Sequence, residues 1–310
     1  MITRADVEAA ARRTAGQVRR TPLLQGDPDD PAGWFKLEYL QHTGTFKARG
    51  AVNRILGAQE RGELDPAVGV VVASGGNAGM ANAWAAAALG VPATVFVPTT
   101  APAVKVQRLR GYGATVVQTG SEYALAYAAA VERAAETGAV YCHAYDQPEI
   151  AAGAGTLGLE LLEDLDGRVD TVLVAVGGGG LMAGVAAAVE GVARVVAVEP
   201  AGAPTLHAAV QAGAPVDVPV SGIAADSLGA RRIGDIGWSV AGRTGVVPVL
   251  VEDDDLVAAR RRLWADHRIA VEHGAAAAFA ALTAGAYVPE PGERVVVVLC
   301  GANTDPADLH

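Results

Sequence analysis

Lys47 is the residue of this chain whose sequence neighbours most favour reactivity. It lies in the motif GTFKARG (44–50), directly after an apolar, strand-like run over 34–40. Loss of solvation beside Phe46 and the positive end of a helix that starts here both lower the pKa of an amine. A deprotonated lysine amine is a nucleophile that forms a Schiff base with a carbonyl group. The alternative is a surface lysine beside a core phenylalanine, because most lysines are exposed.

A run of four glycines is a candidate anion-binding loop. It joins a predicted strand over 172–176 to a predicted helix, and its members are Gly177, Gly178, Gly179 and Gly180. Backbone N–H groups without side chains can close around a phosphate at a helix N-terminus. The string does not match the P-loop pattern, and a dinucleotide-binding loop normally follows the first strand. The alternative is a tight turn that needs glycine only for packing, although four glycines carry a larger entropic cost than a turn requires.

A second glycine loop carries polar side chains. The string Ser74-Gly75-Gly76-Asn77 follows a predicted strand over 68–73 and precedes a predicted helix over 78–89. Its hydroxyl and amide suit a carboxylate or a phenolate better than a phosphate. The alternative is ordinary capping of the helix by serine or asparagine.

Cys300 follows the last predicted strand, over 294–299. A thiol directly after a buried valine run lies at a carboxyl end of the sheet, where α/β proteins bind ligands. The alternative is an inert buried cysteine, which is common.

Alternating segments must position these residues. Short runs rich in valine and alanine alternate with longer alanine-rich periodic segments, a pattern typical of strands and helices around parallel sheets. We predict strands at 68–73, 93–97, 114–118, 171–176, 192–198, 246–251 and 294–299. We predict helices at 78–89, 102–111, 122–136, 181–190, 254–267 and 274–284. The fold class is therefore α/β, and the strands fall into two groups that indicate two lobes.

Composition narrows the class of protein. The chain has 310 residues, 51% of them hydrophobic, so it can bury a sizeable core. Its formal charge of -10 disfavours a nucleic-acid partner. Its two cysteines indicate free thiols and a reducing compartment. Residues 1–20 lack the apolar core of a signal peptide and no run is long enough for a membrane span, so we expect a cytoplasmic protein with no membrane partner.

Four motifs in order resemble the fold type II family of enzymes that use pyridoxal 5'-phosphate (PLP), the tryptophan synthase β and serine/threonine dehydratase family. They are GTFKARG (44–50), SGGNAGMA (74–81), GGGGLMAG (177–184) and CGAN (300–303). The resemblance covers nearly the whole chain. Within it, four strings are most similar to the animal-type L-serine dehydratases, which also deaminate threonine: NAGMA (77–81), GVPAT (90–94), GA (202–203) with HAA (207–209), and LG (228–229). The resemblance implies a two-lobed, three-layer αβα fold with mainly parallel sheets and PLP between the lobes.

The resemblance also implies roles for the motif residues. Lys47 would form the Schiff base with PLP, and Phe46 would pack against the cofactor ring. Asn77 would hydrogen-bond the ring hydroxyl, and Cys300 would face the pyridine nitrogen. The phosphate would be held by Gly177, Gly178, Gly179 and Gly180. The substrate carboxylate would bind to Ser74, Gly75, Gly76 and Asn77.

The implied activity is that of an ammonia-lyase. L-Serine or L-threonine would undergo β-elimination, with Lys47 as general base at Cα and the cofactor phosphate as acid, to give pyruvate or 2-oxobutyrate plus ammonia. A thiol beside the ring nitrogen leaves that nitrogen largely neutral, so a full carbanion at Cα is less stabilised. This suits β-elimination, because departure of the β-hydroxyl consumes the negative charge as it develops at Cα. Three alternatives stay open: a dehydratase of another β-hydroxy amino acid such as phenylserine or 3-hydroxyaspartate, a threonine synthase or β-replacement enzyme, and a cofactor-free binding protein.

Two positions depart from related patterns. Racemases of the family place a serine where this chain has Gly75, and glycine has no proton to deliver to the second face of the substrate. We therefore expect weak racemisation. Ala78 stands where the family often has histidine, so we expect a less polar pocket with room for threonine or a bulkier substrate.

A monovalent cation site, for K+ or Na+, is also implied near the phosphate loop. Its ligands would be the side chains of Glu199 and Thr205 and the carbonyl groups of Ala203, Leu228 and Ala230. Oxygen-only ligation suits a hard cation. The alternative for Glu199 is a charged strand end beside a proline.

The expected domain organisation is a small domain inserted into a large one. Residues 44–146 would form the small domain with the Schiff-base lysine, and residues 1–43 and 147–310 the large PLP-binding domain. No regulatory domain is expected after the last strand, and a homodimer is the family expectation. Glu272 is interpreted as a cap of the predicted helix at 274–284, although the resemblance places this segment along the cofactor cleft.

Overall fold

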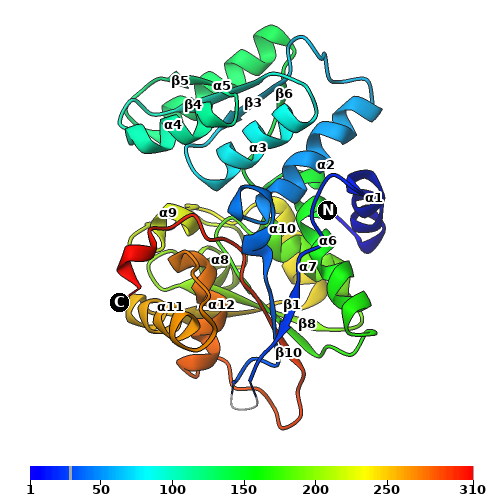
Figure 1. Ribbon diagram of the computed structural model, residues 1–310, viewed down its shortest axis with the longest axis vertical. Coiled ribbons are helices and arrows are strands. Elements are labelled where there is room, and N and C mark those ends of the chain that lie inside the picture. The colour runs from blue at the N-terminus through cyan, green and yellow to red at the C-terminus, as the bar shows by residue number, and fades with distance from the viewer. Residues whose placement is uncertain (28–29, 310) are drawn as a thin grey trace.

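Two β-sheets, each covered by helices, form two lobes in this computed structural model, which describes residues 1–27 and 30–309 (Figure 1). The strands are β1 (Leu23–Gln25), β2 (Trp34–Lys36), β3 (Val70–Ala73), β4 (Ala93–Val97), β5 (Thr115–Gln118), β6 (Val140–Tyr141), β7 (Thr171–Ala175), β8 (Arg194–Pro200), β9 (Val247–Val251) and β10 (Val295–Val298). The helices are α1 (Arg4–Thr14), α2 (Lys47–Glu60), α3 (Asn77–Ala88), α4 (Ala103–Gly111), α5 (Tyr123–Thr137), α6 (Pro148–Asp164), α7 (Gly180–Val189), α8 (Thr205–Ala212), α9 (Ala225–Leu228), α10 (Asp235–Thr244), α11 (Asp253–His267) and α12 (His273–Thr283). This architecture confirms the predicted α/β class.

The smaller sheet has four parallel strands in the order β5-β4-β3-β6. Successive side chains of a strand point to opposite faces. Val70 and Val72 of β3 accordingly share a core with α2, α3 and α4, whereas Val71 and Ala73 share one with α5. Both faces of this sheet are therefore covered, and the carboxyl ends of its strands are left to form a binding site.

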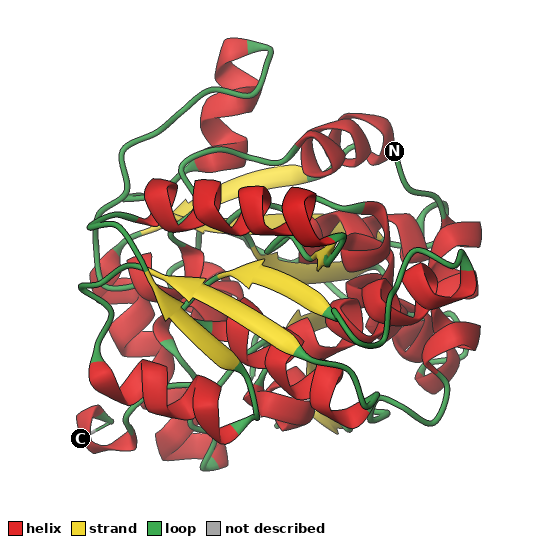
Figure 2. Cartoon of the chain, turned by 90° about the horizontal axis from the view of Figure 1, so that it is seen from above, coloured by secondary structure: helices red, strands yellow, loops and turns green. Residues whose placement is uncertain are grey.

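The larger sheet has six strands in the order β1-β2-β10-β7-β8-β9. Only the β1–β2 pair is antiparallel. Helix α12 packs against strands β7, β8 and β10 with α11 behind it, while α7 packs against β7 and β8 with α6 behind it. Figures 1 and 2 show helices on both sides of this sheet. The four valines of β10 are fully buried or nearly so, as expected of a central parallel strand.

The apolar run over 34–40 is not one strand, so this prediction was wrong in length. Strand β2 ends at Lys36, and a short 3-10 helix, Glu38–Leu40, follows. The turn places the buried carboxylate of Glu38 against Arg49, with Nη2 2.7 Å from Oε1. A buried ion pair therefore lies directly after this strand.

Several short or glycine-containing elements were not predicted. Strands β1 and β6 have only three and two residues, too few for a periodic pattern. Helix α6 contains Gly153, Gly155 and Gly158, and glycine is a poor helix former. These glycines permit close packing instead, because a Cβ atom on Gly155 would lie 2.3 Å from the carbonyl oxygen of Gly184 in α7.

The two sheets draw on different parts of the chain. Strands of the smaller sheet come from residues 70–141, and those of the larger sheet from residues 23–36 and 171–298. The domain boundaries at 44–146 stay a prediction. None of the helices in the described part of the chain is long and apolar enough to cross a membrane.

Candidate active site

A pocket lies where the loops of both sheets meet the start of α2. Its empty space, including the part open to solvent, is about 720 Å³. Most of the predicted site residues line it together: Phe46, Lys47, Asn77, Gly177, Gly178, Gly179, Gly180 and Cys300. Gly75 and Gly76 line an adjoining pocket that shares Asn77. The sequence motifs therefore converge on one place at the carboxyl ends of the strands.

Lys47 is the first residue of α2, and its amine is set for nucleophilic chemistry. Its Nζ donates a hydrogen bond to the carbonyl oxygen of Ala144 at 3.0 Å and lies 4.8 Å from the ring centroid of Phe46. Desolvation lowers the pKa of this amine from 10.5 to about 8, although the negative charge of Glu272 acts in the opposite direction. A substantial fraction of the amine is therefore neutral near physiological pH.

The other lysines are committed to ion pairs. The chain has only three lysines, at positions 36, 47 and 105. Lys36 is fully buried, with Nζ 2.6 Å from an Oε atom of Glu160, and Lys105 pairs with Asp226. Within the described residues Lys47 forms no ion pair. Lys47 is thus the amine that the fold leaves available for a carbonyl group.

The loop from Gly177 to Gly180 presents unused hydrogen-bond donors to the pocket. Its carbonyl groups are occupied: Gly177 accepts from Thr205 Oγ1 at 2.6 Å, and Gly178 accepts from Gly234 N at 3.1 Å. Among the described residues, none of its four N–H groups donates to a protein acceptor. Such N–H groups before a helix form an anion site. The donor set fits the phosphate of PLP.

Close packing also requires glycine in this loop. The alternative interpretation, a tight turn that needs glycine for packing, is therefore correct in part. Gly179 has a φ of +86°, in the left-handed region. A Cβ atom on Gly178 would lie 2.4 Å from ring atoms of Tyr145, and one on Gly180 would lie 2.6 Å from its carbonyl oxygen. The loop therefore needs its glycines both for backbone geometry and for contact with Tyr145.

Asn77 belongs to a buried polar network. Its Nδ2 donates to Oε1 and Oε2 of Glu272 at 2.8 and 3.1 Å, and its Oδ1 accepts from Asn303 Nδ2 at 2.7 Å. Burial raises the pKa of the Glu272 carboxyl, while the hydrogen bond from Asn77 acts in the opposite direction. The network holds the Asn77 amide in place at the pocket wall. Its predicted contact with the PLP hydroxyl stays a prediction.

The loop over 74–77 folds partly onto itself. Ser74 Oγ accepts a hydrogen bond from Gly76 N at 3.2 Å, which fixes the turn before α3. A Cβ atom on Gly75 would meet only Val97 Cγ1, at 3.5 Å, which is an ordinary contact. Gly75 therefore has room for a side chain, and its lack of one is not imposed by packing. The predicted binding of a carboxylate here stays a prediction.

Cys300 is 4% exposed and follows β10 at the pocket wall. Burial strongly raises the pKa of its thiol, so the group is neutral. The Cys300 carbonyl accepts a hydrogen bond from Phe46 N at 3.0 Å, which ties the start of α2 to the end of β10. A neutral thiol at this place is compatible with the predicted contact to an uncharged ring nitrogen.

The sequence interpretation missed the loop after β6. His143, Ala144 and Tyr145 line the pocket, and His143 Nδ1 accepts hydrogen bonds from the backbone N–H groups of Tyr145 and Asp146 at 3.2 and 2.8 Å. Burial lowers the pKa of His143, which favours the neutral ring that this role requires. This loop could have been recognised by its position after a strand. However, β6 has only two residues, which are too few to give a periodic pattern in the sequence. Glu272 was interpreted mainly as a helix cap, but it also lines the pocket, and its carboxylate accepts hydrogen bonds from Asn77.

Three of the predicted cation ligands, Glu199, Ala203 and Thr205, lie close together. Glu199 is fully buried, and its carboxylate accepts from Thr205 Oγ1, Leu206 N and His207 N at 2.7–2.9 Å, so it caps α8. Burial raises the pKa of Glu199, while the backbone donors act in the opposite direction. The Ala203 carbonyl accepts from Thr205 N at 3.1 Å.

The remaining cation ligands adjoin the phosphate loop. A Cβ atom on Gly177 would lie 3.1 Å from Leu228 Cα, so Leu228 borders the loop, and Ala230 follows two residues later. The hydrogen bonds from Thr205, Leu206 and His207 account for the burial of the Glu199 carboxylate without a cation. The monovalent cation site stays a prediction.

Known proteins are similar to this chain in both sequence and architecture. Residues 14–301 match the family described as "Pyridoxal-phosphate dependent enzyme". An L-threonine ammonia-lyase of Geobacter sulfurreducens is 39% identical over 306 residues, which are 96% of this chain and 75% of that protein. A phenylserine dehydratase of Ralstonia pickettii is 39% identical over 297 residues, 94% of this chain and 90% of that protein.

A solved structure of maize serine racemase has the same fold. It superposes with a TM-score of 0.91 at 31% sequence identity, covering 99% of this chain and 95% of that one. Relatives of this chain thus include lyases and a racemase.

Proposed function

The chain belongs to the pyridoxal-phosphate dependent enzyme family, and on that premise we propose that it is an ammonia-lyase acting on L-threonine and L-serine. The observation that carries this proposal is the pairing of a desolvated Lys47 amine with an open cradle of four N–H groups in one pocket. The ammonia-lyase similarity, at 39% identity over nearly the whole chain, supports the reaction class. The products would be 2-oxobutyrate or pyruvate, plus ammonia.

Residues of the chain divide the work of holding the cofactor and moving a proton. Bound PLP supplies an electron sink that acidifies the Cα–H bond of an attached amino acid. The N–H groups of Gly177–Gly180 would bind its phosphate, and Cys300 would offer the ring nitrogen an uncharged partner. Lys47 Nζ then accepts the Cα proton, for which its lowered pKa is suited. The Cα–H electron pair would form the Cα–Cβ double bond as the β-hydroxyl takes up a proton and leaves as water, and hydrolysis of the released enamine would give the keto acid and ammonia.

Racemisation is disfavoured although a racemase shares the fold. Inversion at Cα needs a proton donor on the face opposite the base. The predicted position of that donor is Gly75, which has no side chain, and the structure leaves space beside it. Proton return by Lys47 to its own face regenerates the L-isomer, so we expect elimination to dominate.

Gly75→Ser is expected to raise L-to-D conversion of serine by about 100-fold, because a positioned acid contributes roughly 10²- to 10⁴-fold. A Cβ atom at this position would meet only Val97, at an ordinary contact distance, so the fold should be unaffected. Chiral chromatography of serine after incubation with each enzyme measures the gain, and Gly75→Ala is the control for added volume alone. An equal gain in both variants would contradict a role for the hydroxyl.

Uptake of PLP by the apoprotein should accelerate as pH rises, with a midpoint near the Lys47 pKa of about 8. Only the neutral amine attacks a carbonyl, and its fraction increases as pH rises through the pKa. Stopped-flow absorbance of added PLP measures the rate. A midpoint near the ordinary value of 10.5 would show that the amine is not desolvated.

A bulkier β-hydroxy amino acid is the second candidate substrate. The phenylserine dehydratase is as similar to this chain as the threonine ammonia-lyase. Aromatic rings also border the pocket, with His143 and Tyr145 edge to face at 4.7 Å between centroids. Ala78, 4% exposed, adds no polar group there.

Keto acid release from L-threonine, L-serine and phenylserine by the holoenzyme tests the proposal. We expect turnover of threonine and serine, and a higher kcat/KM for phenylserine would assign the chain to the second candidate. A PLP-loaded protein that releases no keto acid from any of the three would refute the lyase proposal. The cytoplasmic location and the homodimer stay predictions, as does the cation.

A further inference from the structure

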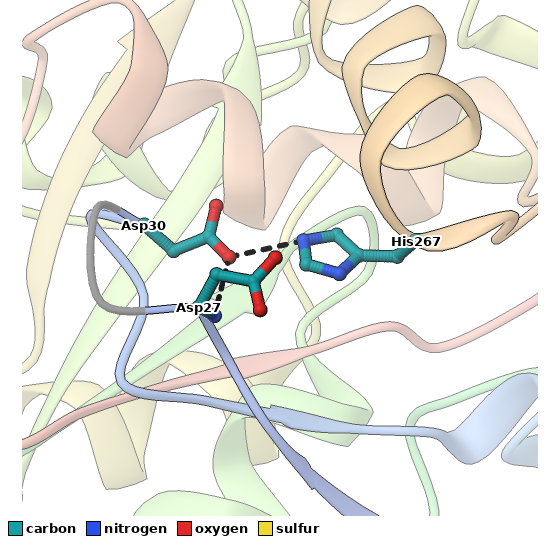
Figure 3. Close-up of side chains that lie close together, drawn as sticks. All are labelled: Asp27, Asp30 and His267. Carbon is teal, nitrogen blue, oxygen red and sulfur yellow. Dashed lines mark hydrogen bonds and ion pairs between the residues drawn. The ribbon is translucent and has the colours of Figure 1, made fainter.

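A cluster of three metal-ligand side chains lies away from the Lys47 pocket (Figure 3). Asp27 follows β1, Asp30 precedes β2, and His267 is the last residue of α11. Because β2 runs parallel to β10, the start of β2 lies at the amino edge of the larger sheet, opposite the carboxyl ends that form the active site. The candidate ligand atoms of the three residues all lie within 4.8 Å of one another.

His267 supplies a buried nitrogen that lacks a hydrogen-bond partner. Its side chain is 8% exposed and its ring packs 5.1 Å from the ring centroid of Phe35. Nε2 points into the cluster, 3.0 Å from Asp30 Oδ2, as Figure 3 shows. The two atoms form an ion-pair contact without hydrogen-bond geometry, and Nε2 has no hydrogen-bond partner among the described residues. A buried polar atom of this kind requires an explanation, and a bound ion is one.

Asp30 is likewise buried and incompletely paired. Its side chain is 4% exposed, and Oδ2 accepts a hydrogen bond from Asp27 N at 2.9 Å. Its other oxygen lies 3.5 Å from Nη2 of Arg262, a long contact. Arg262 is 40% exposed and also contacts Asp266. The arginine therefore lies at the rim of the cluster, and within the described residues it forms no ion pair with Asp27.

We propose that Asp27, Asp30 and His267 bind a divalent transition-metal ion, for which Zn²⁺ is the probe. Imidazole nitrogen with carboxylate oxygen suits Zn²⁺, whereas Ca²⁺ and Mg²⁺ prefer oxygen alone. Three protein ligands leave a coordination position for water. The bound ion would fasten Asp27, after β1, and Asp30, before β2, to the end of α11. Its role is structural, because the cluster lies at the opposite edge of the sheet from the pocket.

Isothermal titration of the chelator-treated holoenzyme with Zn²⁺ tests the site. We expect one ion per chain in the wild type and at least about 100-fold weaker binding in His267→Gln and Asp30→Asn, since even indirect partners of a metal contribute 10- to 100-fold. Asp27→Asn is the second variant, because Asp27 is exposed and its replacement should not disturb folding. Asp266→Asn, one residue from His267 but outside the cluster, is the control and should retain the wild-type affinity.

Thermal unfolding supplies a second readout. Zn²⁺ at 100 times its Kd should raise the Tm of the wild type and of Asp266→Asn by roughly 5 °C, but not the Tm of Asp27→Asn. Keto acid release should be the same with and without Zn²⁺. Wild-type binding no tighter than that of Asp27→Asn and His267→Gln would overturn the proposal, whatever the enzyme's activity.

Discussion

Lys47→Ala is expected to reduce keto acid release by about 10⁴-fold or more, while the protein stays folded. The substitution removes the amine that attacks the carbonyl and the base that takes the Cα proton, and a positioned base alone contributes up to roughly 10⁴-fold. No other lysine can replace it, because Lys36 and Lys105 are held in ion pairs with Glu160 and Asp226. Single-turnover measurement of 2-oxobutyrate formed from threonine gives the loss.

Lys105→Ala is the matched control for the lysine substitution. Lys105 is partly exposed and pairs with Asp226 in the adjoining pocket of Gly75 and Gly76, so its removal changes charge near the site while the phosphate loop and the Lys47 amine stay in place. We expect kcat within about threefold of the wild type, because partly exposed ion pairs contribute little. Activity of Lys47→Ala within tenfold of the wild type would contradict the assigned base, provided that circular dichroism shows both variants folded.

Arg49→Met is expected to lower the free energy of unfolding by roughly 3–5 kcal/mol, the range for breaking a buried ion pair. Arg49 is fully buried, and its Nε and Nη2 bind the Glu38 carboxylate at 2.9 and 2.7 Å. Its Nη1 binds Glu160 at 2.6 Å. Methionine fills much of the volume but leaves two carboxylates facing a buried space. Urea unfolding monitored by fluorescence measures the loss.

Arg12→Met is the control for the arginine substitution. Arg12 lies exposed on α1 and forms no ion pair within the described part of the chain, so its replacement should change the unfolding free energy by less than about 0.5 kcal/mol. Equal losses in the two variants would show that Arg49 is not the centre of a buried network. The expected result assigns Arg49 a structural role in the motif over 44–50, two residues from the reactive lysine.

The residues that could be predicted are those in contiguous motifs. Lys47 and Gly177–Gly180 each combine a strand end, a helix start and a distinctive residue type within a few positions, so their chemistry is readable before the fold is known. The central strands were predictable for a similar reason, since a run such as Val295–Val298 is compatible with little other than a buried strand.

The residues that could not be predicted act through distant partners. Glu272 reaches Asn77 across 195 positions, and Arg49 reaches Glu160 across 111. A polar residue in isolation does not reveal whether such a partner exists. The loop of His143 follows a strand of two residues, too short for periodicity to show. Pairings set by tertiary packing therefore had to come from the structure.

Borohydride reduction of the holoenzyme, followed by mass spectrometry of its tryptic peptides, tests the role of Lys47 most directly. Reduction fixes PLP to the amine that holds it, and the chain has only three lysines. We expect the added mass on the peptide of residues 37–49, with cleavage blocked at Lys47, and on no other peptide. Modification confined to Lys36 or Lys105, or no fixed cofactor in a protein that releases keto acid, would contradict the assignment of Lys47.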